Sequence, residues 1–243
     1  ASPYADAMHE LTKDISKRLG ADAPLLWRRR VMDRLDVAVI ISDKGLCGGF
    51  NDELLRALRR QVDIHRRHNI AVTIFGLGKR AKNHLGKEAV YPEIDISNSD
   101  AGAKLMDLLV GRFLEKKSDG AVIAFNRFRS AVIQEPGYWD VVPLHWRGQG
   151  TERKMLYSYE PGYNEALSML ANSAILTTIR QAFLESSAAE LAARMMAMDK
   201  ATKSADDMIS SLDREYHKAR QASITTDLMD IINGAELLRA EAE

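Results

Sequence analysis

The C-terminal third of the chain contains almost none of the residues that end helices. No proline follows Pro161, and the only glycines between there and the C-terminus are Gly162 and Gly234. A single helix over this tract would be roughly 110 Å long, at a rise of about 1.5 Å per residue. Helical stability in proteins comes mostly from the packing of an apolar face, so a helix of this length needs a partner. We therefore expect one long helix that packs against a partner along most of its length.

An apolar stripe predicts which face of this helix is covered. Alternate steps of three and four residues select positions that are apolar or small, apart from Thr177, Gln181 and Thr202. This spacing is typical of a left-handed coiled coil, and the small residues allow close approach. An amphipathic helix lying on a globular core is the alternative, but a domain of this size is too small to cover such a rod. The positions of this stripe, called the seam below, are Leu167, Leu170, Ala174, Thr177, Gln181, Leu184, Ala188, Leu191, Met195, Met198, Thr202, Ala205, Ile209, Leu212, Tyr216 and Ala219.

The apolar stripe changes face near the C-terminus. After Ala219 it resumes out of phase with the seam. The final turns are therefore predicted to face a different surface from the middle of the helix. The positions of this second stripe are Ile224, Leu228, Ile231, Ala235 and Leu238.

Composition limits the classes of protein that remain. A chain of 243 residues, 46% hydrophobic, is long enough for one sizeable core plus an extended element. Lys and Arg number 34 and so do Asp and Glu, so the charge balance does not indicate nucleic acid as a partner. The single cysteine, Cys47, excludes an internal disulfide and fits a reducing compartment. The longest apolar run, residues 37–41, is far shorter than a membrane span, so we expect no direct membrane insertion.

The pattern before the long helix predicts an α/β body. Strands alternating with helices are typical of a mainly parallel sheet with helices packed on it. The fold class is therefore α/β: a compact, Rossmann-like body plus a very long C-terminal coiled-coil helix. We expect three parts: the end of an N-terminal helix and a linker at 1–35, the body at 36–158, and the long helix at 159–243. The predicted strands are 37–41, 70–75, 89–94 and 120–125, with a hairpin or edge strand from 129–135 and 139–143; the predicted helices are 51–68, a short one ending near Gly86, and 100–116.

A glycine-rich loop, SDKGLCGGFN at 42–51, separates the first strand from the first helix of the body. Phosphate-binding loops occupy this position, but the spacing matches neither G-x-G-x-x-G nor the P-loop. We interpret Gly45, Gly48 and Gly49 as allowing a tight turn and close packing, with Asn51 capping the next helix.

Other candidates for chemistry are weaker. Cys47 lies before a helix N-terminus, where a thiol can be activated, but no histidine is close in sequence and a packed thiol is favoured. His65 and His68 are three residues apart, without an evident third metal ligand. The segment FGLGKR at 75–80 could hold an anion, although a glycine turn with solvated basic residues is the favoured interpretation. We predict no catalytic site, no metal and no cofactor.

Two segments carry a family resemblance. The loop SDKGLCGGFN and the C-terminal sequences ELAARMMAMDKAT and YHKARQASITTDLMDIINGAE resemble the gamma subunit of the F-type ATP synthase, and the likeness runs from residues 2–5 to 159–161. In that family the α/β body is the foot of a central rotor, and two long helices form an antiparallel coiled-coil axle inside a ring of alternating alpha and beta subunits. The chain begins where the family's N-terminal helix would be ending, so the helix that should pair with the seam is expected to be missing from this sequence.

The resemblance implies a function and a set of partners. The chain is expected to be a non-catalytic subunit that couples rotation of a membrane c-ring to catalysis on the beta subunits. Its implied partners are the alpha, beta and epsilon subunits and the c-ring. Its implied location is peripheral, on the cytoplasmic face of the bacterial inner membrane or the matrix face of the mitochondrial one.

The resemblance also implies roles for particular residues. Arg220 and Gln221 match a pair that contacts a catch loop on a beta subunit, and Thr225 could add a hydroxyl contact one turn later. A guanidinium beside an amide suits a carboxylate-rich loop. Arg194 and Glu190 match a charged site near the beta levers, with a simple i,i+4 helix pair as the alternative.

Tyr159 and Glu160 match the foot position at the junction with epsilon and the membrane ring.

Two other functions stay open at this point. One is a small nucleotide-binding α/β enzyme that uses the loop at 42–51. The other is a homodimeric coiled-coil adaptor in which two copies of the long helix pair.

Overall fold

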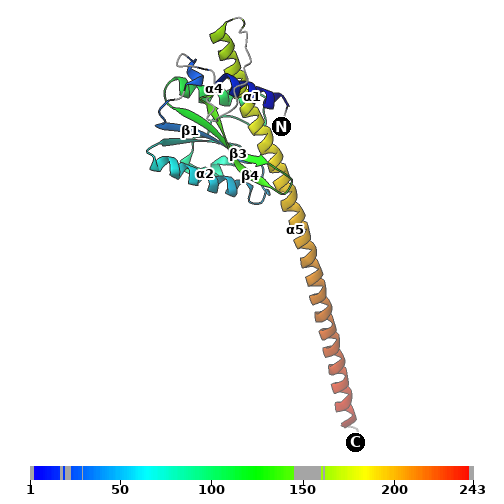
Figure 1. The fold of residues 1–243 in the computed structure, drawn as a ribbon. Coiled ribbons are helices and arrows are strands. Elements are labelled where there is room, and N and C mark those ends of the chain that lie inside the picture. The colour runs from blue at the N-terminus through cyan, green and yellow to red at the C-terminus, as the bar shows by residue number, and fades with distance from the viewer. Residues whose placement is uncertain are drawn as a thin grey trace. The chain divides into compact units, whose positions relative to one another are not determined.

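The computed structural model describes residues 3–16, 19, 23–28, 30–144, 160 and 162–240, with side chains described as far as residue 235. The chain divides into two units, Ala1–Met196 and Ala197–Glu243. The first contains a helix α1 (Pro3–Ser16), the α/β body and the beginning of the long helix α5 (Tyr163–Ala240). The second contains the remainder of α5. The prediction of one uninterrupted C-terminal helix is confirmed (Figure 1).

The body is built on a four-stranded sheet in the order β2-β1-β3-β4. β1 pairs in parallel with both β2 and β3, and β3 and β4 form an antiparallel hairpin. The predicted α/β class with a mainly parallel sheet is therefore confirmed. The strands are β1 (Arg34–Ile40), β2 (Ala71–Leu77), β3 (Gly120–Phe128) and β4 (Gln134–Val142).

Two predicted strands differ from the structure. The segment at 89–94 forms only a single bridge, between Phe75 and Val90, and no strand. Pro92 has no N–H group to donate to a ladder, which prevents the pairing from extending. The segments at 129–135 and 139–143 are not two strands, because residues 129–133 lie in the hairpin connection and β4 runs unbroken from Gln134.

Helices cover both faces of the sheet (Figure 1). On one face, Val37 and Val39 of β1 pack with Leu54 and Leu58 of α2 (Phe50–Arg67). On the other face, the cluster contains buried side chains of β1, of α4 (Ala101–Leu114) and of α5. Burial of both faces explains why residues 35–40 of β1 are all buried and mostly apolar. The remaining described helices are the short α3 (Ala81–Leu85) and two single 3-10 turns, η1 (Leu25–Trp27) and η2 (Gly86–Glu88).

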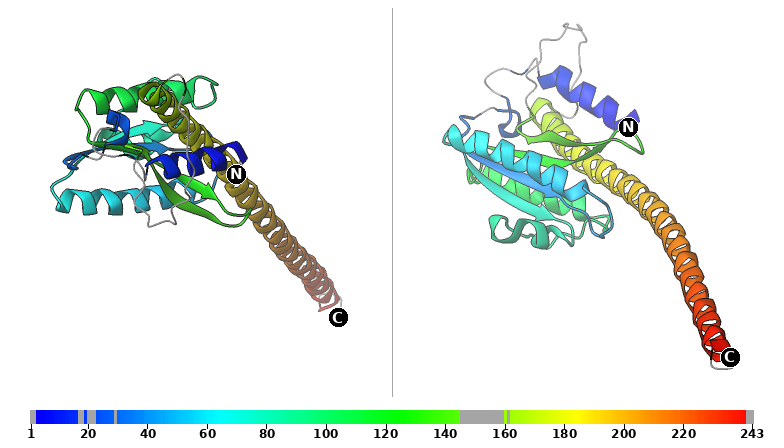
Figure 2. Two further views of the ribbon diagram at one scale, coloured as in Figure 1. Left: turned by 45° about the horizontal axis from the view of Figure 1, so that its top comes forward. Right: turned by 90° about the horizontal axis from the view of Figure 1, so that it is seen from below.

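α1 lies beside the first part of α5 (Figure 2). Ile15, near the end of α1, packs in one cluster with Leu167 and Ala171. Tyr4 and Ala5, at its start, line a hollow with residues of α5 between 177 and 188. The two helices therefore run in opposite directions, and α1 covers the beginning of the seam.

α5 has a second apolar face, which the spacing of apolar residues in the sequence does not separate from the seam. In the first unit, its buried positions recur mostly at steps of three and four and pack on the body, and two of them, Leu167 and Ala174, also belong to the seam. Later seam residues are exposed instead: Leu184 is 70% exposed and Leu191 is 63% exposed. The positions of the buried face are Leu167, Ala171, Ala174, Ile175, Ile179, Ala182, Ser186 and Ala189.

A buried ion pair joins the sheet to α4. Both carboxylate oxygens of Asp36, which is 1% exposed, accept from the guanidinium of Arg112, at 2.7 Å and 3.1 Å. The hydrogen bonds to Asp36 raise the pKa of Arg112 above its ordinary value, so this side chain stays charged. The guanidinium also lies 5.2 Å from the centre of the Phe75 ring. Removing one partner would leave a buried charge unpaired.

We expect Asp36→Asn to lower the free energy of unfolding by about 3 to 5 kcal/mol, because Arg112 loses its counter-ion in a largely buried place. Urea unfolding followed by tryptophan fluorescence measures this change. The control is Asp100→Asn, which breaks an exposed pair with Lys104 and should cost less than about 1 kcal/mol. Equal losses in the two variants would contradict the interpretation.

Candidate functional site

The sheet places the glycine-rich loop at a position where α/β proteins commonly bind ligands. α2 follows β1 on one face and α4 precedes β3 on the other, so the chain reverses its winding between β1 and β3. Ligands of such sheets bind outside the carboxyl ends of the strands at this switch point. The loop at 42–49 follows the carboxyl end of β1, so it lies at this point.

Asn51 ties the loop back to the end of β1. Its Oδ1 accepts from the backbone N–H of Ser42 at 3.1 Å, and its Nδ2 donates to Ser42 Oγ at 2.8 Å. Nδ2 also lies 3.2 Å from Nε2 of His84. The prediction that Asn51 caps the next helix is therefore wrong: α2 begins at Phe50, and its N-cap is Gly49. The Asn51 amide instead bonds across the loop, because Ser42 offers it a backbone N–H donor and a hydroxyl acceptor.

The glycines have separate roles. Gly48 has φ of 58°, a conformation that favours glycine. A Cβ at Gly45 would meet the guanidinium of Arg80, the end of a flexible side chain, so close backbone packing at Gly45 stays a prediction. Leu46, between them, also has a positive φ, of 62°, and its side chain is 72% exposed. A leucine in this conformation is uncommon and needs surrounding contacts to hold it.

The space at the switch point is filled by the chain itself. Asn126 of β3 donates from Nδ2 to the backbone oxygen of Phe50 at 2.7 Å. Cys47 and Phe50, each 5% exposed, form a cluster with Ala189 of α5, against which Ala193 also packs. The packed-thiol interpretation of Cys47 is confirmed. α5 thus lies against the loop at the place where other sheets of this type hold a ligand.

The second glycine turn is also occupied by protein. Oδ1 of Asp43 accepts from the backbone N–H of Lys79 at 2.9 Å, and Oδ2 accepts from the hydroxyl of Ser97 at 3.2 Å. The amide that an anion would use at residues 75–80 therefore already binds a carboxylate. This contact joins the loop at 42–49 to the turn after β2.

Arg194 and Glu190 lie at the same place on α5. The Nε of Arg194 donates to the backbone oxygen of Gly45 at 3.1 Å, and its Nη2 pairs with Oε1 of Glu190. Their side chains are 21% and 17% exposed. The i,i+4 pair considered from the sequence is present, but the contact with Gly45 was not predicted because nothing in the spacing indicates which loop meets the helix.

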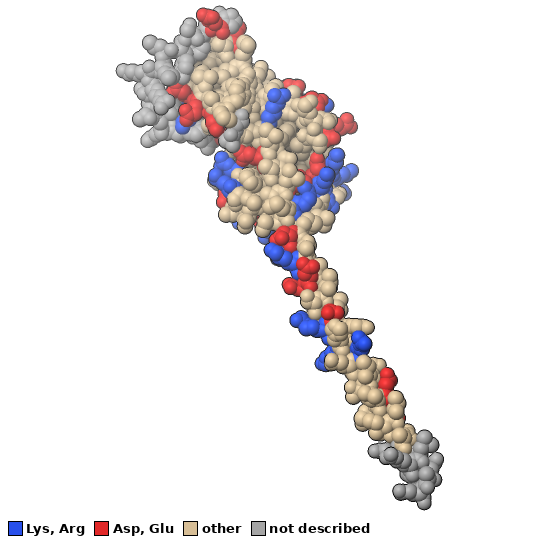
Figure 3. Space-filling view, turned by 90° about the vertical axis from the view of Figure 1, so that its right-hand side faces the viewer, with Lys and Arg blue, Asp and Glu red and all other residues tan. Residues whose placement is uncertain are grey.

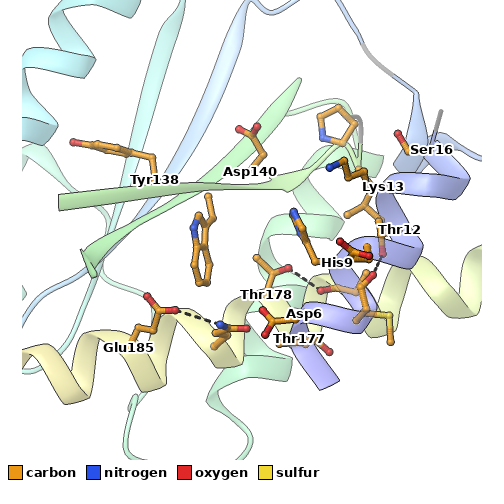
Figure 4. A pocket seen from close by; sticks show the side chains of 18 of the residues that line it. Asp6, His9, Thr12, Lys13, Ser16, Tyr138, Asp140, Thr177, Thr178 and Glu185 are labelled. Carbon is orange, nitrogen blue, oxygen red and sulfur yellow. Dashed lines mark hydrogen bonds between the residues drawn. The ribbon is translucent and has the colours of Figure 1, made fainter. Parts of the chain in front are cut away.

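A hollow of about 650 Å³ lies between α1, β4 and α5 (Figure 4). Asp6, His9 and Lys13 of α1 border it, together with Asp140 of β4 and Thr178 of α5. Its lining combines acidic, basic, hydroxyl and aromatic groups, and Arg127 of β3 also contributes to it. This variety is typical of a groove between packed elements and does not by itself define a reaction.

Tyr138 points away from the other labelled side chains of this hollow (Figure 4). It packs against the α2 face of the sheet, and burial raises the pKa of its hydroxyl. Among the described residues the hydroxyl has no hydrogen-bond partner. Within the lining of the hollow, Oε1 of Glu185 accepts from Nε2 of Gln181 at 3.2 Å, and Oε2 of Glu185 lies 3.8 Å from Nε of Arg127.

The predicted catch residues lie in the second unit. Arg220, Gln221 and Thr225 are all exposed. Gln221 and Thr225 are one turn apart, and the Thr225 hydroxyl donates to the backbone oxygen of Gln221 at 2.9 Å. Of the two predicted foot residues, Glu160 is exposed and Tyr159 lies outside the described residues.

Large apolar side chains of the second unit are exposed within this chain. The seam residues Ile209, Leu212 and Tyr216 are 58% to 64% exposed, and Ile224 and Ile231 of the second stripe are 46% and 68% exposed. Charged side chains of both signs are interspersed among uncharged ones along this part of α5 (Figure 3). Exposed apolar stripes of this extent mark a protein–protein surface.

Known proteins match this chain over nearly its whole length. A model of the family described as ATP synthase matches residues 1–238. The ATP synthase gamma chain of Fuscovulum blasticum is 34% identical, over 98% of this chain and 86% of the relative. That of Trichlorobacter lovleyi is 33% identical, over 98% of this chain and 85% of the relative. The chain belongs to the ATP synthase gamma-chain family.

Solved structures share the fold at lower sequence identity. A chain of the Euglena gracilis mitochondrial ATP synthase, in an OSCP/F1/c-ring structure in rotational state 3, matches with a TM-score of 0.66 and 18% identity, over 99% of this chain and 88% of that one. A chain in the rotor structure of the same enzyme in rotational state 1 matches with a TM-score of 0.56 and 18% identity, over 91% of this chain and 90% of that one.

Family membership confirms the predicted class of function. A gamma chain is a non-catalytic central-stalk subunit of the F-type ATP synthase and is peripheral to the membrane. Among the described residues, none of the helices combines the length and apolar character that a membrane span requires.

We expect Ala189→Leu to destabilise the first unit by about 1 to 3 kcal/mol, because the larger side chain overpacks the fully buried contact with Cys47 and Phe50. The neighbouring Ala188→Leu is the matched control, since Ala188 is exposed and should change stability by less than about 0.5 kcal/mol. Urea unfolding of both variants measures the difference. Similar stabilities for the two would show that α5 does not pack on the loop as described.

Proposed function

We propose that this chain is the rotating shaft of an F-type ATP synthase, coupling rotation of a membrane c-ring to ATP synthesis or hydrolysis in an alpha–beta hexamer. Family membership supports the stalk assignment, and the exposed apolar stripes of α5 are the single observation that carries the proposal. A helix with such stripes requires surrounding protein, which a hexamer around a central helix supplies.

The mechanism follows from asymmetry. A rigid element that contacts each surrounding subunit differently stabilises a different conformation in each of them. When the element turns, these conformations exchange among the subunits in sequence. The shaft needs no nucleotide or metal of its own for this task.

We also propose a role for each residue that matches a motif of the family. Arg220 and Gln221 form the orientation-sensitive contact with a beta catch loop, supported by their exposure on the second unit. Thr225 lies beside them, although its hydroxyl already donates within the helix. Tyr159 and Glu160 belong to the junction with epsilon and the c-ring. Arg194 and Glu190 belong to a charged site near the beta levers.

We further propose that the complex lies on the cytoplasmic face of a bacterial inner membrane or on the matrix face of a mitochondrial one. The bacterial gamma chains among the relatives favour the former.

Co-purification with separately supplied alpha and beta subunits tests the shaft proposal. We expect one copy of this chain for each three alpha–beta pairs, and a change in ATP hydrolysis when it is present. If a version extended by an N-terminal helix binds and this chain does not, the seam needs its second helix. Failure of both versions to bind would reject the proposal, and saturable nucleotide binding by the isolated chain, or its self-association through α5, would favour the enzyme or the adaptor.

We expect Arg220→Ala combined with Gln221→Ala to weaken coupling at least about tenfold, since truncating such an anchor typically costs 2 kcal/mol or more. The ratio of protons pumped to ATP hydrolysed by the reconstituted enzyme measures this effect. Arg214→Ala, an exposed arginine on the same helix, and Arg59→Ala, on α2, are the controls and should have little effect. An equal loss in a control would reject the catch assignment.

A further inference from the structure

We propose that Arg194 is an internal latch that fixes the loop at 42–49 to α5, so that the α/β body and the beginning of the shaft move as one piece. The proposal rests on the shaft function for its consequence, but the latch itself can be tested on the isolated chain. The juxtaposition that carries it is the guanidinium of Arg194, the backbone oxygen of Gly45 and the carboxylate of Glu190.

Two hydrogen bonds hold the guanidinium of Arg194. Its Nε donates to Gly45, 149 residues away in the sequence, while its Nη2 is held by Glu190 four residues earlier on the same helix. Glu190 therefore orients the guanidinium toward the loop. Both side chains are about four-fifths buried, and hydrogen bonds to charged groups are worth more in such surroundings than on the surface.

Arg194 binds the loop beside a residue in an unfavourable backbone conformation. Gly45 directly precedes Leu46, whose positive φ is unfavourable for a leucine. Such a conformation persists only when neighbouring contacts determine it. The guanidinium of Arg80 lies close to Gly45, and Arg194 binds the Gly45 carbonyl, so the hydrogen bond from Arg194 holds the loop directly beside its least favourable backbone.

Hydrogen bonds connect the loop at 42–49 to other elements of the body. The same loop is joined to the turn after β2 through Asp43 and to the beginning of α2 through Asn51, and the first residue of α2 is in turn bonded to Asn126 of β3. The contact with Arg194 adds α5 to this set. Torque applied to α5 can therefore reach the sheet through the loop, in addition to the apolar contacts around Ala189.

This assignment differs in kind from that of the catch residues. Arg220 and Gln221 are exposed and have their side chains available to a partner, whereas the charge of Arg194 is already used within the chain. Arg194 is therefore a positioning residue. Its loss should loosen the loop and thereby reduce coupling.

The single cysteine provides a probe of the latch. Cys47 lies two residues after Gly45 and is 5% exposed, so its reaction with a thiol reagent requires the loop to open. The labelling rate then reports the population of the opened loop. Because the chain contains no other cysteine, the signal has one source.

The experiment measures Cys47 labelling by dithionitrobenzoate in the full chain. We expect Arg194→Ala to raise the rate about tenfold or more, the range expected for a lost charge-assisted hydrogen bond, and Arg194→Lys to restore part of the protection. Glu190→Gln, which keeps the size of the side chain, should give a smaller increase. Lys200→Ala, an exposed residue of the same helix, should leave the rate unchanged. Wild-type rates in both Arg194→Ala and Glu190→Gln would overturn the latch, as would an equal increase in Lys200→Ala.

A second readout tests the consequence for coupling. In complexes reconstituted with alpha and beta subunits and the membrane sector, we expect Arg194→Ala to lower the ratio of protons pumped to ATP hydrolysed several-fold, with the amount of assembled complex unchanged. Faster labelling with unchanged coupling would overturn the role in torque transfer. If the wild-type chain does not assemble with alpha and beta subunits, the shaft function fails, while the labelling rates still decide whether the latch exists.

Discussion

The packing of the first turns of α5 against the sheet is the contact on which the rest of the structure depends. Ile175 and Ile179 are fully buried in one cluster with side chains of β1, β3 and α4. This part of α5 is therefore a core element of the body. The later residues of α5 are joined to that core through one continuous helical backbone. Small side chains at Ala171, Ala182 and Ala189 allow the backbone to lie close to its neighbours.

The α/β body shows how a fold that commonly binds ligands can serve as a structural part. The switch point between β1 and β3 is the position at which such sheets hold nucleotides, and here it contains Phe50, Cys47 and the face of α5 around Ala189. Fold alone does not determine function, because function depends on the side chains placed at the site. In this chain those side chains bind one another, and the glycine-rich loop joins four elements of the same protein.

Much of the fold was predictable because local patterns determine it. The apolar run of β1 and the periodic pattern of α2 identified both elements to within a few residues, and the absence of proline identified α5. The two faces of α5 were not separated because alanine satisfies a close-packed seam and a buried core contact equally well. The bridge at Val90 and the role of Asn51 depend on the three-dimensional placement of Phe75 and Ser42, which a pattern of neighbouring residues does not specify.

The candidate site was predictable only in part, for the same reason. Resemblance of motifs indicated Arg194 and Arg220 as functional, but it carried no information on their surroundings. The structure distinguishes them: Arg194 is engaged by Gly45 and Glu190, and Arg220 is exposed. A rotating shaft needs both kinds of residue. Apolar contacts are non-directional and oppose rotation little, so the stripes of α5 suit a surface that must turn within its surroundings. Charged hydrogen bonds are directional, so they hold one orientation, either permanently inside the shaft or transiently at a partner. The division between buried and exposed arginines on one helix is therefore the arrangement expected of a part that must be rigid within itself and release its neighbours in turn.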